Sequence, residues 1–126
     1  MKRIKAKHVV YILLFGLLVQ GCAETFEKDL SKKTVRLFAP SDGVTAADSA
    51  AMTFAWDSLD GANRYTLQVV TPSFDSVVQL LADTTVNGFF YTIPQLTTRG
   101  RYQWRVMGLN NTSSSEYSVV RSFTVQ

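Results

Sequence analysis

The fold is decided by the segment Leu96-Thr97-Thr98-Arg99-Gly100-Arg101-Tyr102-Gln103-Trp104-Arg105-Val106-Met107-Gly108-Leu109-Asn110. From residue 101 onward, one face carries Tyr102, Trp104, Val106 and Gly108, and the other carries Gln103, Arg105 and Met107. This period of two predicts a strand with one buried and one solvated face. Leu96, six residues before Tyr102, suits a tyrosine corner, in which the tyrosine hydroxyl bonds back to the preceding turn. The segment is therefore predicted to be the central strand of a β-sandwich.

Further segments with the same alternation predict the partner strands. They are residues 34–39, 51–56, 64–70, 77–81, 84–86, 89–93 and 117–125. Pro40-Ser41-Asp42-Gly43 and similar turn sequences separate them, and residues 44–50 are predicted to be a loop. About seven short strands with turns at roughly 8–12-residue spacing predict an all-β, seven-stranded sandwich. Its expected aromatic core consists of Phe54, Trp56, Tyr65, Tyr91, Tyr102, Trp104 and Phe123.

The first 21 residues are typical of an export signal. Four basic residues precede an uncharged apolar run at residues 9–19, about half the length that spans a bilayer. Without this leader, nine basic and ten acidic side chains remain, a formal net charge of −1. The basic character therefore belongs to the leader, and binding to nucleic acid, which needs clustered basic charge, is not expected.

The single cysteine, Cys22, follows Leu18-Val19-Gln20-Gly21, which resembles the lipobox of bacterial lipoproteins. The resemblance implies cleavage before Cys22 and acylation of that residue, so that fatty chains hold the protein on a membrane. We expect this to be the outer membrane, in either its periplasmic or its surface leaflet. The alternative is an ordinary secretory peptide with an incidental cysteine. We expect a signal peptide at residues 1–21, the lipidated cysteine and a short tether at 22–34, and one folded domain at 35–126. A short amphipathic helix around residues 25–31 is the alternative to a flexible tether.

Several of these segments together resemble a fibronectin type III domain. They are Met52-Thr53-Phe54-Ala55-Trp56, Gly61-Ala62-Asn63-Arg64-Tyr65-Thr66-Leu67, the segment from Leu96 to Asn110, and Arg121-Ser122-Phe123-Thr124-Val125. The Tyr-x-Trp-Arg-Val run and the Arg-Ser-Phe-Thr ending are similar to the variant found in bacterial cell-surface proteins. The chain departs from the family pattern at Thr98, where many members have proline, and in the longer segment 74–88. The resemblance implies a non-catalytic interaction module.

The expected mature chain contains few types of side chain that could act in catalysis or bind a transition metal. The one histidine, His8, lies in the leader, and the one cysteine is the expected acylation site. Nucleophile pairs and metal sites that need imidazole or thiolate are therefore not expected. Asp57 and Asp60 are the nearest carboxylate pair, in a turn where aspartate is favoured for local backbone bonding. We predict no enzymatic activity, no cofactor and no metal site.

Two candidate binding surfaces follow from the pattern. The outward face of the central sheet is predicted to carry Arg64, Thr66, Gln68, Gln103, Arg105 and Met107, as a solvated face or as a docking face for a partner. Phe74, Phe89 and Phe90 lie near predicted loops, where they either complete the core or stack on sugar rings.

Four short sequences resemble the acceptor pattern for O-glycosylation of exported proteins in some Gram-negative bacteria. The acceptor hydroxyls would be those of Ser49, Ser58, Ser76 and Thr84. Asp-Ser and Asp-Thr are also common turn pairs, which is the alternative reading. The functional expectation is a membrane-anchored accessory subunit that docks on another envelope protein, with a glycan-binding surface lipoprotein as the alternative.

Overall fold

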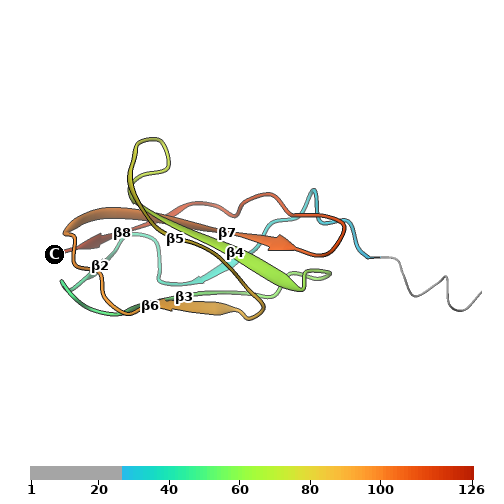
Figure 1. Cartoon of the computed structure of the whole chain (residues 1–126), viewed down its shortest axis with the longest axis horizontal. Helices are drawn as coiled ribbons and strands as arrows, with labels where there is room; N and C mark the ends of the chain where they lie inside the picture. The colour runs from blue at the N-terminus through green and yellow to red at the C-terminus, as the bar shows by residue number, and fades with distance from the viewer. Residues whose placement is uncertain (1–26) are drawn as a thin grey trace, which may run out of the picture.

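The computed structural model describes residues 27–126, which form two β-sheets packed face to face (Figure 1). The strands are β1 (Leu37–Ala39), β2 (Val44–Ala46), β3 (Met52–Trp56), β4 (Arg64–Pro72), β5 (Val77–Val86), β6 (Phe90–Ile93), β7 (Gly100–Leu109) and β8 (Arg121–Val125). One sheet has the order β1-β3-β6 and the other β2-β8-β7-β4-β5. All pairings are antiparallel except that of β2 with β8. The predicted all-β sandwich is confirmed.

Strand β7 is the central strand of the five-stranded sheet, as predicted. It pairs with β4 on one side and β8 on the other. Tyr102, Trp104 and Val106 are fully buried, while the alternate residues Gln103 and Arg105 are half-buried on the other face. The period-two pattern therefore identified both faces of the strand correctly.

The tyrosine corner is also present. The Tyr102 hydroxyl donates a hydrogen bond to the carbonyl oxygen of Thr98, and Leu96 is buried beneath the turn. The backbone of Leu96 is held from both sides, because its amide donates to Ala50 (3.2 Å) and its carbonyl accepts from the amide of Ser49 (2.9 Å). The turn before β7 is thus tied both to the core and to the chain before β3.

Aromatic rings fill the space between the sheets. Phe54 of β3 contacts Trp104 (5.1 Å between ring centroids) and Phe123 (5.7 Å), so the two layers meet through these rings. Tyr102 stacks on Phe123 at 4.9 Å. Of the seven predicted core aromatics, Tyr91 is half-buried because β6 is an edge strand of the smaller sheet.

Several strand predictions differ from the structure. Residues 44–46, predicted as loop, form the edge strand β2, which runs parallel to β8 with Val44 opposite Phe123. Residues 77–86, predicted as two strands, form the single strand β5, and β4 continues to Pro72 instead of ending at residue 70. Two irregularities in the β4–β5 register, between Leu80 and Ala82 and between Val77 and Gln79, absorb the positions where the alternation is broken.

The last strand, β8, begins at Arg121, four residues after the predicted start at residue 117. Residues 117–120 are not part of β8, although the chain there remains beside β7. The amides of Val106 and Gly108 donate to the hydroxyls of Ser118 (3.0 Å) and Ser115 (2.8 Å). Buried serine side chains thus replace a regular ladder beside β7 before Arg121.

The described part of the predicted tether, residues 27–34, packs on the sandwich. Leu30 is completely buried, and its amide donates to the hydroxyl of Ser113 (3.0 Å). The amide of Glu116 donates to the carbonyl of Lys33 (3.0 Å). The folded unit therefore includes residues before the predicted boundary at 35, because one apolar side chain and several backbone groups find partners there.

Candidate interaction surfaces

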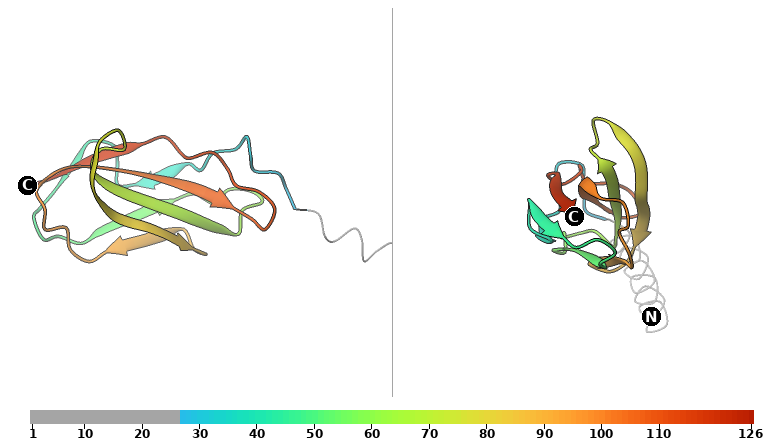
Figure 2. Two further views of the ribbon diagram at one scale, coloured as in Figure 1. Left: turned by 45° about the horizontal axis from the view of Figure 1, so that its top comes forward. Right: turned by 90° about the vertical axis from the view of Figure 1, so that its left-hand side faces the viewer.

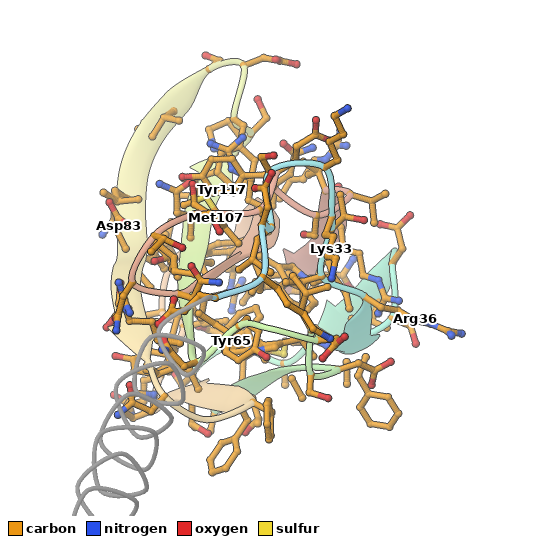
Figure 3. All side chains as sticks on the ribbon, turned by 90° about the vertical axis from the view of Figure 1, so that its right-hand side faces the viewer. Lys33, Arg36, Tyr65, Asp83, Met107 and Tyr117 are labelled. Atoms are coloured by element: carbon orange, nitrogen blue, oxygen red, sulfur yellow. The ribbon has the colours of Figure 1, made fainter. Side chains whose placement is uncertain are left out.

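The outer face of the five-stranded sheet brings together the six polar and apolar residues predicted for it. Cross-strand pairing sets Thr66 opposite Met107, Gln68 opposite Arg105 and Val70 opposite Gln103, while Arg64 faces Leu109. All six of the predicted residues are half-buried. Figure 3 shows Met107 and Tyr117 on this outer side and Tyr65 between the sheets.

Arg105 lies between two aromatic rings on this face. Its guanidinium carbon is 4.0 Å from the ring centroid of Phe74 and 3.9 Å from that of Tyr117. Its Nε donates to Oε1 of Gln68 (2.9 Å), and Oε1 of Gln103 accepts from the amide of Phe74 (2.9 Å). A guanidinium stacked on aromatic faces is stabilised by cation–π attraction. Arg105 therefore joins the β4–β5 turn, β7 and the segment before β8.

Arg64, at one end of the same face, is held by the chain itself. Its Nη1 donates to the side-chain oxygens of Asn63 (2.9 Å) and Asn111 (3.2 Å), and its Nη2 donates to the carbonyl of Asn110 (3.1 Å). Thr66 forms a hydroxyl hydrogen bond with Thr85 of β5 (2.8 Å). Many of the polar side chains predicted for docking therefore form hydrogen bonds with neighbouring strands and loops of the same chain.

The three phenylalanines considered for sugar stacking do not form one platform. Phe74 packs on Arg105, and Phe89, half-exposed after β5, contacts the ring of Tyr65 edge-on at 5.7 Å. Phe90 of β6 is 65% exposed on the three-stranded sheet. That sheet also carries Phe38 of β1, which is 69% exposed and is not among the predicted binding residues. The alternation of residues 35–39, with Leu37 inward, was the signal that placed Phe38 outward.

The predicted modification sites differ in exposure. Ser49, Ser58 and Ser76 are exposed residues outside the strands, and Ser49 has a positive φ of 65°. Thr84 lies within β5 opposite Leu67 and is half-buried. Cys22 lies outside the described residues.

The acidic turn residues Asp57 and Asp60 form ion pairs with nearby basic side chains. Asp60 accepts a hydrogen bond from the Lys28 ammonium, which lowers the pKa of that carboxyl. Asp57 is 3.9 Å from Arg36. Within residues 27–126, no group of three or more histidine, cysteine, aspartate or glutamate side chains is arranged to hold a metal ion. The same residues contain no helix long and apolar enough to cross a bilayer.

Sequence reasoning missed an exposed apolar edge. Val77, Val78 and Leu80 of β5 are 50%, 81% and 54% exposed, and β5 is the last strand of its sheet. Figure 2 shows the β4–β5 hairpin extending beyond the rest of the sandwich. The apolar residues at 77–81 predict a short strand, but they do not indicate which other element covers it.

The chain matches no protein-family model and no curated protein, whereas solved structures match its fold. The human fibronectin type III domain containing protein 3 has a domain that aligns with a TM-score of 0.54 at 17% identity, over 78% of this chain and 89% of that one. This chain has a fibronectin type III fold. The fibronectin(III)-like modules of Clostridium thermocellum CbhA align with a TM-score of 0.54 at 12% identity, over 72% and 93% of the two chains. An Fn3-like protein from Clostridium thermocellum gives 0.50 at 20% identity, over 71% and 96%. Fibronectin type III domains are generally non-catalytic.

Proposed function

We propose that this protein is a non-catalytic interaction module, anchored to the outer membrane of a bacterial cell envelope through acylated Cys22, and that it docks as an accessory subunit on another envelope protein. The fibronectin type III fold and the lipobox resemblance at residues 18–22 support this proposal. The mature chain would contain no imidazole and no free thiol, which further favours binding over catalysis.

The observation that carries the proposal is the attachment of residues 28–33 to one end of the sandwich. The Asn110 side chain, which is buried, donates to the carbonyls of Lys28 (2.7 Å) and Gly61 (3.1 Å). Cys22 is six residues before Lys28, and six residues span at most about 20 Å. An acylated Cys22 would therefore keep this end of the domain close to the bilayer, with the C-terminal end directed away (Figure 1).

The test has two parts. Replacing residues 1–21 with a cleavable secretory signal peptide, together with Cys22→Ala, should move the protein from the membrane fraction to the soluble envelope fraction. Photo-crosslinking residues placed singly at Phe90, Met107 and Val78 sample the three-stranded face, the five-stranded face and the β5 edge. We expect a specific adduct with one envelope protein from at least one position. The absence of a specific adduct from all three positions would contradict docking, and an unchanged membrane fraction for the variant with both changes would contradict the anchor.

A second candidate function is glycan binding, favoured by the exposed pair Phe38 and Phe90. Phe90 pairs with Ala55, and Ala55 pairs with Ala39, the neighbour of Phe38, so the two rings lie on one sheet with a small residue between them. Flat aromatic faces of this kind are able to stack on sugar rings. The double variant Phe38→Ala/Phe90→Ala should lose retention on envelope polysaccharide, and unchanged retention would remove this candidate.

A further inference from the structure

We infer that the free edge of β5 is the docking element of this module, and that its partner contributes an extended strand with a basic residue opposite Asp83. The inference rests on the proposed function, since it names the surface and the kind of partner for the same docking activity. We call residues 77–86 the β5 edge.

The β5 edge has unmet hydrogen-bonding capacity along ten residues. Strand β5 pairs with β4 on one side and is the terminal strand of its sheet on the other. In an antiparallel ladder, alternate residues of an edge strand direct their N–H and C=O groups away from the sheet. In residues 27–126, no other segment forms backbone hydrogen bonds with this outer side. A row of free backbone donors and acceptors is a template for an added strand.

The edge also lacks the usual protection. Edge strands in monomeric proteins are commonly short or carry lysine, arginine or proline, whereas residues 77–86 contain none of these. Val78 and Leu80 are among the most exposed large apolar side chains of the described residues. The bulges in the register bend the strand but leave its outer side uncovered. Exposed apolar surface beside a free strand edge is typical of an interaction site.

Charge selects the chemistry of the partner. Between residues 72 and 98 the chain carries two charged side chains, Asp75 and Asp83, both acidic. Asp83 is exposed, lies at the outer margin of the molecule in Figure 3, and has no cation within ion-pair distance among the described residues. Opposite charges on neighbouring strands stabilise a pair, and like charges destabilise it. The added strand is therefore expected to place lysine or arginine opposite Asp83.

A second copy of this chain fits the edge less well. The strands run along the long axis of the domain, with residue 27 at one end and the C-terminus at the other (Figures 1 and 2). Antiparallel pairing of two β5 strands would direct the two Cys22 anchors to opposite ends, beyond the reach of six residues to a common bilayer. In-register parallel pairing would set the two Asp83 carboxylates side by side, about 4.8 Å between strands. A different protein meets neither obstacle.

The binding test uses three capped peptides and the full chain in detergent. The first alternates threonine and valine around a central lysine, the second has glutamate in place of the lysine, and the third has proline at two central positions. Fluorescence anisotropy measures affinity, and hydrogen exchange locates the protected amides. We expect the lysine peptide to protect amides within residues 77–86, the glutamate peptide to bind about five-fold more weakly, and the proline peptide not to bind. No binding of the lysine peptide, or protection confined to other strands, would overturn the inference.

Charge exchange provides the matched control. Asp83→Lys should reverse the preference between the lysine and glutamate peptides, whereas Glu116→Lys, the same change in charge at an exposed residue outside β5, should leave it unchanged. An unchanged preference in Asp83→Lys would overturn the predicted pairing. Val78→Lys should weaken binding without lowering the melting temperature, since the side chain is exposed.

Two competing occupants have distinct outcomes. Protection of the β5 edge by vesicles of phosphatidylethanolamine and phosphatidylglycerol, with no peptide present, would assign the edge to the membrane and overturn the inference. Concentration-dependent protection of the protein alone would assign it to a second copy, with the same consequence. In cells, an adduct from Phe90 or Met107 but not from Val78 would also overturn it while leaving the proposed function standing.

Discussion

Replacing Asn110 with alanine should destabilise the protein more than any other substitution of a polar side chain at this end of the domain. Asn110 is buried, and its Nδ2 donates to the carbonyls of Lys28 and Gly61. Its Oδ1 accepts from the amides of Thr112 (3.0 Å) and Ser113 (2.8 Å). One side chain thus satisfies four backbone groups from three separate segments.

The magnitude follows from these four hydrogen bonds. A net contribution of about 1 kcal/mol for each gives a loss of about 3–4 kcal/mol in the free energy of unfolding. This is a large part of the about 5–15 kcal/mol that a whole domain typically has. Asn110→Asp should lose at least as much, because a carboxylate oxygen would then face the two carbonyl oxygens now bound by Nδ2.

Urea unfolding followed by the fluorescence of the two buried tryptophans measures the loss. Asn111→Ala is the matched control, because Asn111 is exposed and its side chain accepts a single hydrogen bond, from Arg64; we expect a change of less than about 0.5 kcal/mol. Hydrogen exchange should become faster at residues 28–33 in Asn110→Ala than in the rest of the domain. Stability within about 0.5 kcal/mol of the parent protein, with unchanged exchange at residues 28–33, would refute the reasoning.

Three further predictions concern the corner and the stacked arginine. Tyr102→Phe removes the hydrogen bond to Thr98 and should cost about 1 kcal/mol in urea unfolding; no loss would mean that the corner bond is not stabilising. Burial raises the pKa of the Tyr102 hydroxyl, so the folded state holds this proton more tightly than the unfolded chain does. The free energy of unfolding contributed by this group should be complete below the usual tyrosine pKa of 10.0 and fall as pH rises above it, and a Tyr102→Phe variant with the same alkaline slope would contradict this assignment. Arg105→Ala frees the rings of Phe74 and Tyr117 and should cost about 1–2 kcal/mol, with Arg105→Lys intermediate; equal melting temperatures for all three proteins would show that the stack contributes nothing.

The sequence predicted the parts of the fold that rest on alternation and large side chains. Tyr102, Trp104 and Val106 fall on one face by spacing alone, and their size leaves the core as the place for them. The spacing of Leu96 and Tyr102 indicated the tyrosine corner. A tyrosine near the start of such a strand is buried, and its hydroxyl needs a hydrogen-bond partner in the preceding turn. These predictions depended on local patterns, which a single sequence contains.

The features that the sequence did not predict depend on contacts between distant segments. Strand β2 is three small residues, and its strand character comes from pairing with β8 far along the chain. The stacking of Phe74 and Tyr117 on Arg105 joins residues from three segments. Asn110 resembled an ordinary turn residue, since nothing local indicates that it binds the backbone of Lys28. Residues 28–33 lie before the expected start of the domain at 35, and their contacts with Ser113 and Asn110 are likewise distant in sequence.

The exposed β5 edge was missed for a different reason. Valine and leucine at residues 77–80 indicate a strand, and apolar residues in strands are expected to be buried. Whether a strand ends a sheet is a property of the topology, and Val78 lies on β5, which is the last strand in the order β2-β8-β7-β4-β5. Only the arrangement of all the strands identifies this surface.

The intact mass of the protein extracted from membranes shows whether this fibronectin type III-fold module is held on a membrane by its modified cysteine. We expect a chain that begins at Cys22 and carries the added mass of two or three fatty acyl chains. A soluble, unacylated chain that still begins at Met1 would contradict it.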